Sequence, residues 1–390
     1  MAVARALSEQ GFTPMVFEKQ SKYGGVWNYT GRGPMYKTLN TNLPTILMEY
    51  NHYPFPPDTE FPDRSVVQKY VTSYCEQVRA KVQFDVTICQ ATKIGDQWVL
   101  TDSKGCEYYS DFLVIATGHY DVPYYPPIRR LDISSDGRIT HSRYYDSPAL
   151  YKGKHVLLVG NASSAVDIAV QLLSEGARVS ISRRHEGSTD ELFEKYATLK
   201  PEISEISSNE VQFIDGSVDS PDIILFCTGY LYSFPFLDDY NNILSIPLLH
   251  PKRLRLCNLH RNIFYIGDTT LAFVAMDKMI VPMPYSECQG AAIARVWSSS
   301  LTLPPFQEMV ALERLKVSQK GDGAEYHNMP SPADVDYMRE LCNWVKQSHS
   351  TGFEAEYWDQ TKYERRLNVK DEKKQQIKDS LSKIKHLTPL

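Results

Sequence analysis

Between residues 155 and 184 the chain alternates apolar and small or polar runs in a regular order. The stretch reads HVLLVGNASSAVDIAVQLLSEGARVSISRR. The continuous apolar run Val156 to Val159 has the length of a buried parallel strand, and it stops at Gly160, where a sharp turn is expected. An amphipathic run follows, and Val179 to Ser182 is a second strand-length segment. The pattern therefore predicts a βαβ unit.

The turn of this unit carries candidate chemistry. Gly160, Ala162 and Ala165 occupy the three small-residue positions of the G-x-G-x-x-G pattern, where a dinucleotide pyrophosphate approaches the backbone. The free N–H groups at the start of the following helix favour an anion. We predict that the phosphate contacts come from Gly160, Ser163, Ser164 and Ala165. Because only the first glycine of the pattern is kept, an ordinary βαβ unit is the alternative.

Arg183 and Arg184 end the second strand, at the position where an acidic residue would hold a ribose hydroxyl. Arginines suit a 2′-phosphate, so the pattern favours NADP(H) over NAD(H). The sequence does not decide which of the two makes the contact, and surface arginines without a ligand are the alternative.

Two internal repeats indicate a second unit of the same kind. LSEQGFTPMVFEK (7–19) parallels LSEGARVSISRR (173–184), 166 positions further on, and the segment 111–118 parallels 222–229. A position 166 residues before Gly160 would lie before Met1, so the sequence does not contain a counterpart of this glycine. We therefore expect the first strand and phosphate loop of this unit to be missing; chance similarity of apolar strands is the alternative.

The remaining periodicities predict further elements. Helices are expected at 2–7, 64–81 and 285–297, strands at 13–17 and 262–268, and a hairpin at 98–110. The small residues of the 285–297 helix would let it lie close to a neighbour. From Glu354 onward the chain is strongly charged, which predicts a solvated helix or a frayed tail.

Composition narrows the class of protein. The chain has 390 residues, 42% hydrophobic content and a net charge of -5, which predicts a globular protein with two or more domains and no nucleic-acid partner. No apolar run is long enough for a membrane span, and no signal peptide is evident, so we expect a cytoplasmic protein. The seven cysteines form no C-x-x-C pair, which predicts reduced thiols and no metal site.

Beyond these patterns, the chain resembles the flavin-containing monooxygenases, most closely the soluble fungal type, over roughly residues 1 to 345. The resemblance rests on several segments together: FEKQSKYGGVWNYT (17–30), LNTNLP (39–44), ATGHYDVP (116–123), VGNASSAVDIA (159–169), TGYLYSFPFL (228–237) and ECQGAAIARVW (287–297). It implies an α/β protein with two Rossmann-like dinucleotide-binding domains, in which an NADPH-binding domain is inserted into an FAD-binding domain whose first strand and phosphate loop are missing.

The resemblance also implies boundaries and an activity. The FAD domain would occupy residues 1–148 and 233–350, the NADPH domain 149–232, and a charged tail 351–390. NADPH would reduce FAD, and dioxygen would then form a flavin hydroperoxide that oxygenates a soft nitrogen or sulfur of a small substrate. The oligomeric state and the substrate are left open.

Residue roles follow from the same resemblance. On the FAD side the matching residues are Glu18 for the ribose, Gly25, Val26 and Trp27 for the flavin loop, Thr41 and Asn42 beside the reactive edge of the flavin, and Gln289 in a helix near the flavin. Asn42 would be the catalytic residue, since its amide could hydrogen-bond the peroxide. His141 and Tyr145 match a family fingerprint and are interpreted as structural.

Two other functions remain open at this stage. A Baeyer–Villiger type oxygenase would use the same cofactors on ketones. The second alternative is a flavin-free remnant that binds NADP but has no turnover. If Met1 is the true start, the first phosphate loop is missing, and we expect weak FAD binding or none.

Overall fold

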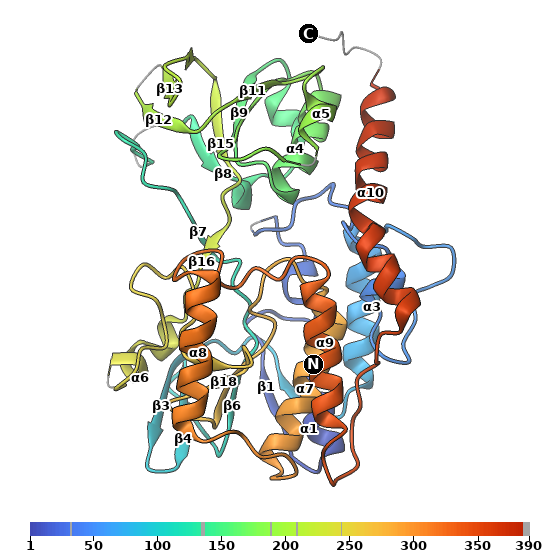
Figure 1. Ribbon diagram of the computed structural model, residues 1–390, viewed down its shortest axis with the longest axis vertical. Coiled ribbons are helices and arrows are strands. Elements are labelled where there is room, and N and C mark those ends of the chain that lie inside the picture. Colours follow the sequence, from blue (N-terminus) through green and yellow to red (C-terminus); the bar gives the residue numbers. More distant parts are fainter. Residues whose placement is uncertain (32, 134–136, 188, 208–209, 243, 385–390) are drawn as a thin grey trace. The chain divides into compact units, whose positions relative to one another are not determined.

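The computed structural model describes residues 1–390 except 32, 134–136, 188, 208–209, 243 and 385–390, and it divides into two compact units (Figure 1). Unit 1 comprises Met1–Asn28, Leu43–His119 and Leu231–Leu367, and unit 2 comprises Tyr29–Asn42, Tyr120–Tyr230 and Asn368–Leu390. These contact-based limits differ from the boundaries 148/149, 232/233 and 350/351 expected from the sequence. The assignment of the domains to FAD and NADPH stays a prediction.

Unit 2 is built on a five-stranded parallel sheet with the strand order β11-β10-β9-β15-β8. The strands are β8 Ile139–His141, β9 His155–Val159, β10 Arg178–Ser182, β11 Thr198–Lys200 and β15 Ile223–Phe226. Helix α4 (Ser163–Ser174) connects β9 to β10, which pair in parallel from His155↔Arg178 to Val159↔Ser182. The predicted βαβ unit is confirmed.

Alternate side chains of β9 pack into two separate hydrophobic cores, because successive side chains of a strand point to opposite faces of the sheet. Val156 and Leu158 pack with the buried face of α4, whereas Leu157 and Val159 pack against the three-stranded antiparallel sheet β12-β13-β14. Both faces of the parallel sheet are therefore covered, which explains the uninterrupted apolar run of β9.

The other elements of unit 2 are short. They are β7 Val122–Pro123, η2 Ser142–Tyr144, η3 Pro148–Tyr151, α5 Asp190–Phe193, β12 Ile203–Ile206, β13 Val211–Phe213 and β14 Val218–Asp219, with β16 Tyr230–Leu231 at the end of the segment.

Among the residues that the structure describes, unit 1 contains separate pieces of sheet. Strand β1 (Met15–Phe17) pairs in parallel with β2 (Lys81–Gln83), and β6 (Leu113–Ile115) pairs in parallel with β19 (Leu271–Phe273) of the order β17-β18-β19-β6. Among the described residues β1 and β6 are both edge strands. Both pairings are parallel, as in a doubly wound sheet.

Helix α1 (Ala2–Glu9) lies against α7 (Pro282–Trp297), as the small residues of the later segment predicted. A Cβ added to Gly290 would lie 3.1 Å from the Cα of Val3, so a side chain at this position would push the backbones of the two helices slightly apart. Helix α9 (Ala333–Val345) packs on α7 as well.

Unit 1 also contains α2 Thr45–Met48, α3 Arg64–Gln77, η1 Gly25–Trp27, η4 Pro235–Leu237, α6 Asp238–Asn242, α8 Phe306–Lys320, β3 Ile88–Ile94, β4 Gln97–Asp102, β5 Glu107–Ser110, β17 Leu259–His260 and β18 Phe264–Tyr265. The hairpin predicted at 98–110 is confirmed by β4 and β5. The strand predicted at 262–268 is wrong outside β18, because Arg261 and Asn262 have φ of 52 and 56, which ends extended backbone before the strand.

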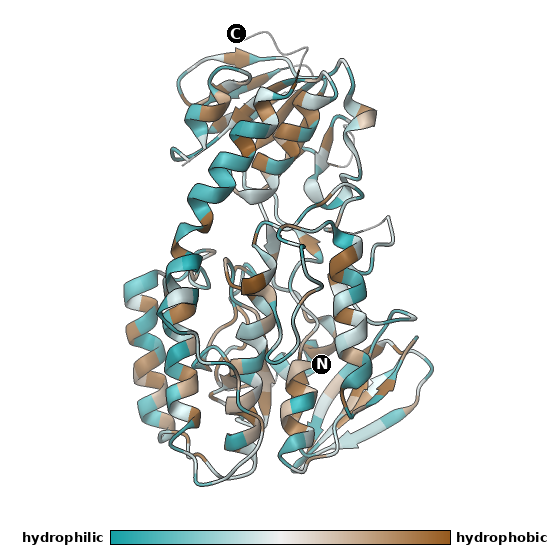
Figure 2. Ribbon diagram, turned by 90° about the vertical axis from the view of Figure 1, so that its right-hand side faces the viewer, coloured by the Kyte–Doolittle hydropathy of each residue, from teal (hydrophilic) through white to brown (hydrophobic). Residues whose placement is uncertain are grey.

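The charged C-terminal segment forms α10 (Gln360–Ser382), and Figure 2 shows hydrophobic residues at intervals on this largely hydrophilic helix. Ile377 and Leu381 are one helical turn apart, and both are buried in the core that contains α4. The expected helix is therefore confirmed, whereas its expected solvation is wrong at Ile377 and Leu381; the part of the helix from Asn368 onward belongs to unit 2. Within the described part of the chain, no helix has the combined length and apolar character required to cross a membrane.

Candidate functional site

The turn after β9 has a geometry that only glycine tolerates. Gly160 has a φ of +109, and a Cβ at this position would lie 3.0 Å from the backbone oxygen of Cys227. Its N–H donates to the Ser182 carbonyl oxygen at 2.8 Å. The missing side chain thus lets the turn lie close to the strand ends β10 and β15.

Helix α4 begins beside this turn without a side-chain cap. Its N-cap residue is Ala162, whose side chain cannot accept a hydrogen bond, and Ser163 and Ser164 are exposed. Ala165 is fully buried and brings the helix close to the sheet. The first backbone N–H groups of α4 therefore have no side-chain cap, as in anion sites at helix N-termini, and the predicted pyrophosphate contact stays a prediction.

The two candidate arginines after β10 have different surroundings. Arg183 forms an ion pair with Asp190, a largely buried carboxylate that also accepts the N–H of Gly187 at 2.6 Å. Arg184 is exposed. The sequence analysis did not identify Asp190 as a partner, although its position at the start of α5, soon after the arginines, was a usable signal.

In unit 1, Glu18 follows β1 at its carboxyl end. Its Oε1 accepts the N–H of Gln20 at 2.8 Å, and the side-chain amide of Gln20 donates to the Gly25 carbonyl oxygen at 3.4 Å. The side chain of Asn28 donates to Oε1 of Gln20. Gln20, which sequence reasoning missed, thus ties Glu18 to the Gly25 turn.

The predicted flavin loop forms the short helix η1. Val26 is 40% exposed, whereas Trp27 packs against the buried cluster that α3 contributes to. Trp27 is therefore anchored in unit 1 and presents only part of its ring. Whether this loop contacts a flavin stays a prediction.

Thr41 and Asn42 lie in unit 2, at the end of a segment held along α4. Tyr36 donates to Asp167 and Thr38 donates to Gln171, both residues of α4. Among the described residues, the buried Thr41 hydroxyl has no hydrogen-bond partner, and Asn42 is exposed. An exposed amide next to an unsatisfied buried hydroxyl is compatible with the predicted ligand contact, which stays a prediction.

Gln289 is fully buried in α7, and the protein uses both ends of its amide. Its Oε1 accepts the N–H of Ala275 at 2.8 Å, and its Nε2 donates to the Tyr337 hydroxyl at 2.9 Å. The observed contacts are those of a packing residue, and its predicted role near the flavin stays a prediction.

The interpretation of His141 and Tyr145 as structural agrees with their surroundings. His141 is fully buried, with Nε2 3.0 Å from the Gly229 carbonyl oxygen and Nδ1 accepting the Arg143 N–H at 3.1 Å. Burial lowers the pKa of His141 to about 4, so the ring is neutral at ordinary pH. Tyr145 is also buried and donates to Gln171 at 3.0 Å.

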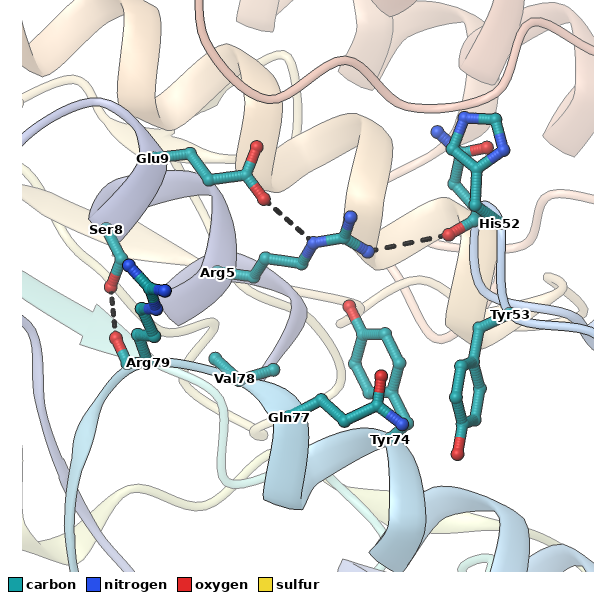
Figure 3. A pocket seen from close by; sticks show the side chains of 10 residues that line it. Arg5, Ser8, Glu9, His52, Tyr53, Tyr74, Gln77, Val78 and Arg79 are labelled. Atoms are coloured by element: carbon teal, nitrogen blue, oxygen red, sulfur yellow. Dashed lines mark hydrogen bonds and ion pairs between the residues drawn. The ribbon is translucent and has the colours of Figure 1, made fainter.

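A separate pocket of about 420 Å³ lies between α1, α3 and the loop around His52 in unit 1 (Figure 3). Its lining is polar and partly charged: Arg5, Ser8, Glu9, Asn51, His52, Tyr53, Tyr74, Gln77, Val78 and Arg79. Arg5 is held by Glu9 at 2.9 Å and by the Asn51 carbonyl oxygen at 3.5 Å. None of the cofactor residues predicted from the sequence lines this pocket.

Behind the pocket is a buried carboxyl group, Glu287, that sequence reasoning also missed. It accepts the N–H of Asn51 at 2.8 Å and the Tyr74 hydroxyl at 3.2 Å, and Arg5 lies 3.8 Å away. Burial raises the pKa of Glu287 to about 7. In the described part of the chain, no group of three or more His, Cys, Asp or Glu side chains is arranged to hold a metal ion.

Comparison with characterised proteins follows these observations. The chain is 28% identical over 387 residues to the thiol-specific monooxygenase of Saccharomyces cerevisiae, covering 92% of this chain and 86% of the yeast protein. It is 30% identical over 359 residues to the trimethylamine monooxygenase of Methylocella silvestris, covering 83% and 76% of the two chains.

Among solved structures, the S-allyl-L-cysteine S-oxygenase of Allium sativum superimposes with a TM-score of 0.81 at 26% identity, over 97% of this chain and 92% of that one. The family model described as flavin-binding monooxygenase-like matches residues 1–190 and 186–350. Because this match spans well over half of the sequence, the chain belongs to the flavin-binding monooxygenase-like family and is an enzyme of the flavin-dependent monooxygenase type.

Proposed function

We propose that the protein uses FAD and NADPH to oxygenate a soft nitrogen or sulfur atom of a small molecule. The observation that carries the proposal is the turn at Gly160: it leads into a helix N-terminus without a side-chain cap, with the exposed Arg184 at the end of the next strand. Backbone N–H groups for a pyrophosphate and a cation for a 2′-phosphate are the two features that NADPH requires.

Within this proposal, unit 2 binds NADPH. The α4 N-terminus holds the pyrophosphate through the backbone of Ser163 and Ser164. Arg184 pairs with the 2′-phosphate, because Arg183 is already paired with Asp190. The charge of Arg183 is partly neutralised by this carboxylate, so the exposed arginine is the better phosphate partner.

Unit 1 binds FAD through Glu18 and the turn at Gly25 in the same proposal. The carboxylate of Glu18 stands at the end of a parallel strand, where such a group accepts hydrogen bonds from a ribose. Gln20 bridges Glu18 and Gly25, so it keeps the carboxylate and the turn at a fixed separation.

When bound, FAD reduced by NADPH supplies the activation of dioxygen that the protein's own side chains cannot provide. In unit 2, the exposed Asn42 amide can donate a hydrogen bond to a bound ligand without giving up a proton, since an amide does not ionise at ordinary pH. In unit 1, Trp27 is anchored in the α3 cluster, so its ring shields the Gly25 turn from water.

The choice of a soft nitrogen or sulfur substrate is supported by the relatives. The proteins that this chain resembles are named for thiols, trimethylamine and S-allyl-L-cysteine. The shared chemistry is a nucleophilic atom with an available lone pair. We extend that class to this chain and leave the individual compound open.

The test is an NADPH oxidation assay with purified protein, FAD and dioxygen, comparing a thioether, a tertiary amine and a cyclic ketone. The proposal expects substrate-dependent NADPH consumption with the thioether or the amine, and slower consumption with NADH. Turnover of the ketone alone would support a Baeyer–Villiger oxygenase instead. A rise in melting temperature with NADPH, without flavin binding or turnover, would identify an NADP-binding remnant and contradict the proposal.

A further inference from the structure

Two cysteines far apart in the sequence are in contact inside unit 1. The Sγ atoms of Cys288 on α7 and Cys342 on α9 lie 3.7 Å apart, close enough for a thiol–thiol hydrogen bond. Cys288 is 1% exposed and Cys342 is 6% exposed. Of the other cysteines, Cys89 and Cys106 are exposed and serve as internal references for unpaired thiols.

A small cavity connects this thiol pair with exposed side chains. Its volume is about 10 Å³, and it is lined by Cys288, Ala291, Cys342, Val345, Lys346, Glu354 and Ala355. Such a volume is about that of one water-sized molecule. Lys346 and Glu354 are exposed, so the lining of the cavity combines the two buried cysteines with side chains at the surface.

The two thiols differ in their electrostatic surroundings. The hydrogen bond with Cys288 and the charge of Lys346 lower the pKa of the Cys342 thiol, although its burial and the charges of Glu354 and Glu356 act in the opposite direction. The same hydrogen bond and burial raise the pKa of Cys288. Since the thiolate is the reactive form, Cys342 is the nucleophile of the pair and Cys288 the resolving thiol.

We propose that Cys288 and Cys342 form a peroxide-sensitive modification site, in which hydrogen peroxide converts the two thiols into a disulfide between α7 and α9. The Cys342 thiolate attacks one oxygen of the peroxide, the O–O bond breaks, and the released hydroxide takes a proton to become water. The Cys342 sulfenic acid is then attacked by the Cys288 sulfur, which forms the S–S bond and releases a second water. Two thiols are oxidised and one peroxide is reduced to two waters.

The disulfide can form with only a small movement of the two side chains. A disulfide has an S–S length of about 2.05 Å, so the sulfur atoms must approach each other by about 1.7 Å from their 3.7 Å separation. The new bond would link helices that already pack together, next to the hydrogen bond between Gln289 and Tyr337. Closing the chain between residues 288 and 342 removes conformations from the unfolded state, so the oxidised protein is expected to melt at a higher temperature than the reduced protein.

The test uses the full chain with no substitution. Reduced protein is freed of reductant, treated with hydrogen peroxide, blocked with N-ethylmaleimide and digested with trypsin without reduction. We expect the peptides that contain Cys288 and Cys342 to be recovered as one linked species that is lighter than the sum of the two by two hydrogen atoms. The expected linkage must form at a peroxide concentration that leaves the buried Cys75 unmodified.

Two variants test which thiol reacts first. In Cys288→Ser, Cys342 should accumulate as the sulfenic acid and be labelled by dimedone; in Cys342→Ser, Cys288 should remain a thiol. The wild-type digest remains decisive if either variant fails to fold. The proposal is overturned if both thiols are recovered with maleimide while Cys89 and Cys106 are oxidised, because the pair would then be only a packing contact.

Discussion

The two units contain matching pieces of the same doubly wound pattern, and they differ in one strand. In unit 2, β10 pairs with both β11 and β9, and β15 pairs with both β9 and β8. In unit 1 the equivalent strands, β1 and β6, have one partner each among the described residues. The strand that joins the halves of the sheet, and that leads into a phosphate turn, is β9 in unit 2 and has no described counterpart in unit 1.

This difference shows what the nucleotide motif requires. The helix and the second strand of the βαβ unit occur in both units, as α4 and β10 in unit 2 and as α1 and β1 in unit 1. The turn with positive φ at Gly160 occurs where β9 leads into α4. The proposed anion site of unit 2 therefore depends on the Gly160 turn as well as on the helix that follows it.

The largest effect is expected from Gly160→Val. A side chain here meets the Cys227 carbonyl oxygen and forces a φ of +109 on a β-branched residue, so NADPH binding should fall at least about 100-fold, with a loss of stability. Gly216→Ala is the control, because Gly216 also has a positive φ of +81 but has no atom within 4 Å of an added Cβ. Titration with NADPH measures the affinity of each variant. Equal NADPH affinity in the two variants would show that the Gly160 turn is not the site.

An effect of comparable size is expected in the stability of unit 2 from Leu381→Ala. Leu381 is 2% exposed in the core of unit 2, so its truncation should lower the free energy of unfolding by about 2–5 kcal/mol. Leu367→Ala on the same helix is the matched control, since Leu367 is 42% exposed and should change stability little. Urea unfolding followed by circular dichroism compares them; equal stabilities would contradict a docked α10.

In unit 1, the buried Glu287 should make the stability of the folded protein depend on pH. Its pKa is raised by burial from 4.5 to about 7. The folded chain therefore holds this proton more tightly than the unfolded chain, and stability is lost as pH rises from the unfolded toward the folded pKa, by roughly 3 kcal/mol. Glu287→Gln should remove this loss.

Urea unfolding at several pH values between 4.5 and 8 measures the effect as the difference between variant and wild type. Glu9→Gln is the control, because Glu9 also pairs with Arg5 but lies largely in solvent. A stability difference between Glu287→Gln and wild type that does not change with pH would mean that the pKa of Glu287 is the same in the folded and the unfolded chain.

The smallest effect concerns coenzyme choice in unit 2. Arg184→Ala should weaken NADPH binding roughly tenfold, about 1.4 kcal/mol, and leave NADH binding unchanged, because only NADPH carries the 2′-phosphate. Arg183→Ala is the comparison, since Arg183 is paired with Asp190. A larger loss of NADPH selectivity in Arg183→Ala than in Arg184→Ala would exchange the roles of the two arginines.

The features that the sequence predicted well are local ones. The β9–α4–β10 unit and the β4–β5 hairpin each lie within one short stretch, where the period of apolar residues and the turn residues specify the element directly.

The features that it did not predict depend on contacts between distant segments. Glu287 meets Asn51 and Tyr74, and Cys288 meets Cys342, across separations that no periodicity encodes. The C-terminal segment was predicted to be solvated because of its many charges, and the apolar residues Ile377 and Leu381, one helical turn apart, were not recognised as a buried face. Arg183 and Arg184 look equivalent in the sequence and are distinguished only by the ion pair with Asp190.

The most direct test of the proposed function is the origin of the oxygen atom in the product. The protein, supplied with FAD, NADPH and a thioether, is incubated under isotopically labelled dioxygen, and the sulfoxide is analysed by mass spectrometry. The proposed function predicts one labelled oxygen atom in each sulfoxide for each NADPH consumed. A sulfoxide whose oxygen comes from water, or NADPH consumption that does not depend on FAD, would contradict it.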